Sequence, residues 1–168
     1  MKNILFILCA VMFLMFISDY VISEDLIPAD AIRIRVIASS NDKKDQELKM
    51  MVKEDLEKYL YSKLKDVRSV DKADIVIKNS LDDIDHIVGK YTNNYDVNYG
   101  LNYFPSKEYK GITYKEGEYQ SLVVTLNEGL GNNWWCVLFP PLCMLEAEES
   151  TDVEYRSFVS EMISKYIG

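Results

Sequence analysis

The chain has 168 residues, of which 48% are hydrophobic and 27% charged, a composition typical of a folded globular protein and not of a disordered chain. The net charge is −8, with 19 Lys and Arg against 27 Asp and Glu. This balance disfavours nucleic acid and anionic membrane surfaces as partners, because both require a basic face. The single histidine, His86, leaves little room for histidine-based catalysis.

An apolar run extends from Ile4 to Ile17, directly after Lys2. It is shorter than the about 17–25 residues that a membrane-spanning helix needs, so it is typical of an export signal. We expect residues 1–23 to be a signal peptide cleaved after Ser23, with an uncleaved anchor as the open alternative. Membrane contact is expected only through this segment, if it stays attached. Residues 24–30 are predicted to form a linker and residues 31–168 a single α+β domain.

Hydrophobic periodicity predicts helices and strands in alternating blocks behind the linker. Period-two alternation predicts strands, and three- and four-residue spacing predicts helices. The expected elements are a strand over 32–38, a helix over 42–67, a second helical stripe over 77–91 that begins ambiguously near residue 75, strands over 95–103 and 118–126, and a closing helix over 153–167. This order predicts an α+β fold, a two-layer domain in which two or three helices pack on a small mixed or antiparallel sheet.

The exported part of the chain contains two cysteines, Cys136 and Cys143. An even number of cysteines outside the cytoplasm favours a disulfide, and two buried free thiols are the alternative. Two thiolates and one distant histidine cannot supply the four ligands of a zinc site. We therefore expect neither a metal nor another cofactor.

Both tryptophans stand side by side, in a segment around Cys136 that shows no helical or strand period. Adjacent residues on an extended backbone point in opposite directions, so one core cannot easily bury both rings. Two prolines bar a helix or a central strand there. The segment is predicted to be either a recognition surface or a plug over the core. Its candidate partner-binding residues are Asn133, Trp134, Trp135, Val137, Leu138, Phe139, Pro140, Pro141 and Leu142.

Two acidic clusters could supply paired carboxylates, although a solvated helix face explains each of them. They are Asp82, Asp83 and Asp85, and then Glu146, Glu148, Glu149, Asp152 and Glu154. An exported enzyme acting on cell wall is the alternative function, and it would need two carboxyl groups about 5–9.5 Å apart across a cleft. The turn at Gly129 and Gly131 lacks the third glycine of a dinucleotide-binding fingerprint, so no nucleotide site is expected.

Two segments resemble the stage II sporulation protein R family. Residues 32–56 read IRIRVIASSNDKKDQELKMMVKEDL, and residues 117–143 read GEYQSLVVTLNEGLGNNWWCVLFPPLC. The second segment is the more specific, and the resemblance covers roughly residues 31–145. The chain departs from the family pattern at Lys107, where arginine is usual, and at Lys115 and Glu116, where the family tends to Pro-Ala.

The resemblance implies a signalling protein and not an enzyme. Members of this family are made in the forespore and exported across its membrane into the intermembrane space of the septum. There they activate a membrane-embedded aspartic protease of the mother cell, which processes the precursor of sigma-E. The expected partner is this receptor protease, bound through its extracytoplasmic face.

Overall fold

The computed structural model describes residues 26–144 and 152–167. The predicted signal peptide and residues Glu146, Glu148 and Glu149 lie outside the described residues. Within the described ranges, no helix combines the length and the apolar character needed to cross a membrane.

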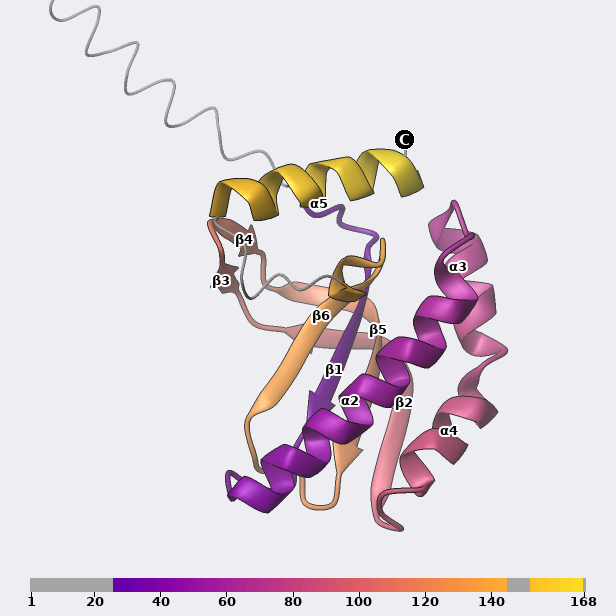
Figure 1. The fold of residues 1–168 in the computed structure, drawn as a ribbon, viewed down its shortest axis with the longest axis vertical. Helices are drawn as coiled ribbons and strands as arrows, with labels where there is room; N and C mark the ends of the chain where they lie inside the picture. Colours follow the sequence, from indigo (N-terminus) through magenta and orange to yellow (C-terminus); the bar gives the residue numbers. More distant parts are fainter. Residues whose placement is uncertain (1–25, 145–151, 168) are drawn as a thin grey trace, which may run out of the picture.

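The elements follow the predicted order closely (Figure 1). The strands are β1 (Ile32–Ile37), β2 (Tyr95–Phe104), β3 (Lys107–Tyr109), β4 (Ile112–Tyr114), β5 (Gly117–Leu126) and β6 (Asn133–Phe139). The helices are α2 (Lys43–Leu64), α3 (Val70–Lys78), α4 (Leu81–Gly89), α5 (Asp152–Ile167) and the short 3₁₀ helix η1 (Leu142–Met144).

The main sheet has four strands in the order β2-β5-β1-β6. β1 is parallel to β5, whereas the pairs β1–β6 and β2–β5 are antiparallel. A parallel pair needs a long crossover connection, and here the chain from α2 to the β3–β4 hairpin supplies it between β1 and β5. β3 and β4 form a separate antiparallel hairpin. The predicted α+β fold with a small mixed sheet is confirmed.

One face of the sheet is covered by α2, α3 and α4, which enclose the main core (Figure 1). The apolar stripe of α2 is fully buried at Val52, Leu56, Leu60 and Leu64. It packs in one cluster with the inward residues of β1 and β5, which are Ile32, Ile34, Val36, Leu122, Val124 and Leu126. The spacing of these side chains on the two kinds of element therefore determines the layer arrangement.

The helical stripe predicted over 77–91 covers the end of α3 and the whole of α4, which are two separate helices. The ambiguous residues near Ile75 belong to α3, so they are helical and not part of a strand. Ser69 begins α3 as its N-cap, with a side chain that accepts a hydrogen bond from the backbone N–H of Lys72. Ser80 separates the two helices, and its hydroxyl donates to the carbonyl oxygen of Val76.

A second cluster lies at the end of the sheet, beneath α5 (Figure 1). It joins Ile27, Ala31, Ile112, Val137, Leu142, Tyr155 and Val159. Ile27 stands in the segment predicted as a linker, yet its side chain is buried here. The C-terminal helix therefore holds the β3–β4 hairpin and the start of the described chain against the main sheet.

The segment that showed no period contains a strand, β6, at the edge of the main sheet. Its second half carries no alternation because it is buried on both faces: Leu138 joins the main core, and Val137 joins the cluster under α5. Pro140 and Pro141 follow directly after the strand ends at Phe139, where no ladder hydrogen bond is required of them.

A glycine turn fixes where β6 begins. The backbone N–H groups of Leu130 and Gly131 donate to the carbonyl oxygens of Ser39 and Ala38. Gly129 has a φ of +63°, in the left-handed region that favours glycine. The buried Lys49 adds a bond from its ammonium to the carbonyl oxygen of Asn132, at 3.1 Å. These hydrogen bonds tie the turn to the chain that follows β1.

Candidate functional site

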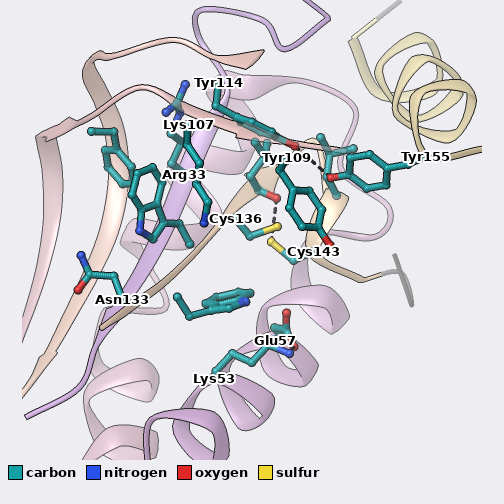
Figure 2. Close-up of a pocket in the computed structure, with 15 residues that line it drawn as sticks. Arg33, Lys53, Glu57, Lys107, Tyr109, Tyr114, Asn133, Cys136, Cys143 and Tyr155 are labelled. Carbon is teal, nitrogen blue, oxygen red and sulfur yellow. Dashed lines mark hydrogen bonds and ion pairs between the residues drawn. The ribbon is translucent and has the colours of Figure 1, made fainter. Parts of the chain in front are cut away.

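A cavity of about 240 Å³ lies along the edge strand β6. Residues of β1, α2, β2, β6, η1, α5 and the β3–β4 hairpin contribute to its wall. Figure 2 shows Lys53 and Glu57 entering from α2 on one side, Tyr155 from α5 on another, and the sulfur atoms of Cys136 and Cys143 between them. The cavity therefore assembles side chains from distant parts of the sequence at one sheet edge.

The two tryptophans line this cavity from opposite faces of the sheet. Trp134 packs against the main core, and the ammonium of Lys53 lies 5.2 Å from its ring centroid. Trp135 lies on the other face, where its ring meets Phe104 edge-to-face at 5.7 Å and the ammonium of Lys107 at 4.9 Å. The predicted opposite directions of the two rings are confirmed.

Both rings are half-buried, so the outward-facing Trp135 does not stand free in solvent. The buried ring of Phe104 at the end of β2, together with Lys107, covers the outer side of Trp135. Sequence alternation predicts the side of the sheet on which a ring lies, but not what packs on that side.

The guanidinium of Arg33 is the most deeply buried cation of the cavity, and the residue is 4% exposed. It stacks on Tyr119, with 3.3 Å between the guanidinium carbon and the ring centroid. Its Nη2 donates a long hydrogen bond of 3.4 Å to the carbonyl oxygen of Lys115. Its Nε and Nη1 are buried and find no hydrogen-bond acceptor among the described residues. Burial lowers the pKa of Arg33 by disfavouring the charged form.

One carboxylate, Glu57, faces the cavity from α2. Its Oε2 forms an ion pair with the ammonium of Lys53 at 3.0 Å, one helical turn earlier. Burial raises the pKa of Glu57, and the hydrogen bond and charge of Lys53 partly oppose that shift. Glu57 is thus paired with Lys53 through Oε2, whereas its buried Oε1 has no hydrogen-bond partner among the described residues.

Cys136 and Cys143 are free thiols in the structure, and Figure 2 shows their sulfur atoms facing one another. The thiol of Cys143 donates to the carbonyl oxygen of Val137 at 2.9 Å. Burial, followed by the influence of Cys136, raises the pKa of the Cys143 thiol, which keeps it protonated. The disulfide therefore stays a prediction, with its two partners already adjacent.

We expect the two cysteines to be joined when the chain is recovered from an oxidising compartment. A small closed loop of this kind contributes on the order of 2–3 kcal/mol by loop entropy, so reduction should lower the melting temperature by several degrees. The measurement is maleimide labelling of the unfolded chain, with and without prior reduction, followed by mass spectrometry. Labelling of both cysteines without reductant would show that they remain thiols, and a Cys136→Ser variant is the control.

The candidate partner-binding residues divide into an accessible and a buried part. Asn133 is exposed, and Trp134 and Trp135 are half-exposed at the cavity. The other candidates are buried, namely Val137, Leu138, Phe139, Pro140, Pro141 and Leu142. The segment is thus accessible at its start and part of the core at its end. Partner binding by the accessible residues stays a prediction.

Sequence reasoning missed the charged wall of the cavity, which consists of Arg33, Lys53, Glu57 and Lys107. Arg33 alternates with apolar residues on β1, a pattern that also fits an ordinary solvated sheet face. Lys53 and Glu57 look like an exposed pair on a long helix, spaced four residues apart. These four charged side chains come together only in the folded protein, because β6 lies at the edge of the sheet.

The remaining candidates lie away from the cavity. His86, Asp82, Asp83 and Asp85 are all exposed on α4, and Asp83 accepts a hydrogen bond from the hydroxyl of Tyr59. Glu154 is exposed on α5. In the described ranges, no three His, Cys, Asp or Glu side chains gather as metal ligands would. None of these carboxylates of α4 and α5 lines the cavity, so they offer no converging acid–base pair there.

Comparison with known proteins gives one family and one named relative. The family model described as stage II sporulation protein R matches residues 28–149. A Bacillus subtilis (strain 168) protein named stage II sporulation protein R is 37% identical over 127 residues, which cover 72% of this chain and 57% of that relative. The chain therefore spans little more than half the length of this curated relative. No solved structure matches the chain.

Proposed function

The chain belongs to the stage II sporulation protein R family, and from that premise we propose that it is the exported signal that activates the processing of pro-sigma-E. In this proposal the forespore makes the protein and exports it into the intermembrane space of the septum. There it binds the membrane-embedded aspartic protease of the mother cell and shifts that protease towards its active state. A ligand can do this only by binding the active state more tightly than the inactive one.

The observation that supports a binding role is the tryptophan-walled cavity at the edge of the sheet. Tryptophan is among the residues that most often dominate binding energy at interface centres. Here Trp134 and Trp135 stand half-exposed on a strand, and each ring already packs against the domain, Trp134 on the main core and Trp135 on Phe104. Preorganised rings lose little conformational freedom on binding, which favours affinity.

Reconstitution of precursor cleavage tests the proposed function. The candidate receptor protease and pro-sigma-E are placed together in membranes, and cleavage is followed with and without the purified chain. Cleavage that depends on the chain, and that saturates with its concentration, is the expected result. Cleavage that proceeds equally without the chain, or never occurs in its presence, would reject the proposal.

We expect residues 1–23 to be separable from signalling. The apolar run from Ile4 to Ile17 is short for a membrane span, so its expected task ends with export. Replacing residues 1–23 by an unrelated, efficiently cleaved export signal should leave sigma-factor processing within about twofold of the original. Loss of processing despite normal export would instead show that the native segment acts as an anchor or as a receptor contact.

A further inference from the structure

The cavity beside β6 has more positive charge than its own carboxylate can match. Arg33, Lys53 and Lys107 line it, whereas Glu57 already forms its ion pair with Lys53. The Nε and Nη1 of Arg33 find no acceptor within the described residues, and both atoms are closed off from solvent, so Arg33 offers the cavity its charge and not these two donors. A buried positive charge is costly unless an anion lies near it. The cavity therefore has the chemistry of a carboxylate-binding site.

The same cavity borders an open strand edge. In the part of the chain that the structure describes, β6 pairs only with β1, so its other edge has no strand partner. Such an edge is a template for an added strand. Trp134 and Trp135 line the cavity from opposite faces of the sheet, which means that the cavity follows this edge around both faces. A strand laid along β6 would send alternate side chains towards the two tryptophans.

The volume of the cavity indicates what kind of carboxylate it accepts. About 240 Å³ is less than the roughly 300–1,000 Å³ of ordinary small-molecule sites, which favours a single side chain over a complete metabolite. A glutamate or aspartate side chain that enters from a neighbouring strand meets apolar walls along its stem and cations at its end.

We propose that the free edge of β6 binds an extended acidic segment of a protein partner, whose carboxylate enters the cavity between Arg33 and Lys107. The inference rests on the proposed function only for the identity of the partner, which would be the receptor protease. The strand edge supplies main-chain hydrogen bonds, the tryptophans supply apolar contact, and the two cations select an acidic side chain over its neutral amide.

Fluorescence of the native chain offers a direct test, because Trp134 and Trp135 are its only tryptophans. The full chain in mild detergent is titrated with the capped peptide acetyl-Thr-Val-Glu-Val-Thr-amide and with its glutamine counterpart. We expect a saturable change in emission, with the glutamate peptide binding at least about tenfold more tightly, as one charge-assisted hydrogen bond implies. Equal affinity of the two peptides, or no change with either, would overturn the proposal.

Three charge variants test the role of charge in peptide binding: one should weaken it, one should tighten it and one should leave it unchanged. Lys107→Glu should weaken binding of the glutamate peptide about tenfold, and Glu57→Gln should tighten it about threefold by removing a nearby negative charge. Lys72→Glu is the matched control, because Lys72 is exposed on α3 and does not line the cavity; it should bind as the unchanged chain does. Melting curves show whether each variant is folded. If the variant of the half-buried Glu57 unfolds, the variant of the exposed Lys107 decides the test by itself.

Sodium glutarate separates a peptide site from a site for free dicarboxylates. Glutarate should bind at least about tenfold more weakly than the peptide, since it forms no strand pairing. Equal binding of glutarate would replace the docking proposal by a small-anion site. Because these titrations contain no protease, peptide binding without activation would reject only the proposed function, and activation without peptide binding would reject only this site.

Discussion

Replacing Gly131 with alanine should lower the free energy of unfolding by about 3 kcal/mol or more, at or beyond the upper end of the usual cost of overpacking. A Cβ at this position would overlap the carbonyl oxygen of Ser40 and lie 2.6 Å from its carbonyl carbon. Backbone atoms cannot move aside as a flexible side chain would. The turn would therefore separate from Ser40, and the hydrogen bonds of Leu130 and Gly131 to Ser39 and Ala38, just after β1, would be lost.

Gly100→Ala is the matched control for this substitution. Gly100 lies in β2, and a Cβ there would meet no atom within 4 Å. Its unfolding free energy should change by less than about 1 kcal/mol, in the stabilising direction if the unfolded chain loses freedom. Urea denaturation of the two variants measures both effects. Equal stability of the two would show that the turn yields easily and does not position β6.

Removing the tryptophans one at a time should separate stability from signalling. Trp134→Ala should cost about 3 kcal/mol, because its ring packs against the main core. Trp135→Ala should cost about 2 kcal/mol, since it removes half-buried apolar area together with the edge-to-face contact with Phe104, but no contact with the main core. At equal concentrations of folded protein, Trp135→Ala should still weaken receptor activation about thirtyfold, the equivalent of about 2 kcal/mol for a tryptophan at an interface centre.

Thermal melts of both variants, followed by the processing assay, test this pair. Tyr103→Ala is the control, because Tyr103 is an exposed aromatic on β2 that does not line the cavity. It should signal normally once folding is matched. Normal signalling by the folded Trp135→Ala variant would place the receptor contact elsewhere on the molecule. Equal destabilisation by both tryptophan variants would show that each ring acts as part of the core.

Much of the fold follows from local patterns in the sequence. The three- and four-residue spacing that ends in Leu56, Leu60 and Leu64 is sufficient to predict α2 and its buried face. Strict alternation from Tyr95 onward likewise predicts β2, and Pro105 accounts for its end. These elements each bury one face, and a one-sided environment leaves a period in the sequence.

β6 was missed as a strand for the opposite reason. Leu138 faces the main core and Val137 the cluster under α5, so consecutive residues are apolar and no period survives. The break between α3 and α4 at Ser80 was missed because the apolar stripe continues across it. Hydrophobic periodicity reveals an element that is buried on one face, but it cannot reveal an element that is buried on both faces.

The sequence alone determined the layer arrangement, the opposite directions of Trp134 and Trp135, and the family, because each of these depends on residues that are neighbours in the chain. The cavity depended on tertiary structure. Arg33, Lys53 and Lys107 come from three separate elements, and they meet only because β6 returns antiparallel to β1 at the sheet edge. Charge in such a site is the sum of contributions from distant segments, and no local pattern records which segments the sheet brings together.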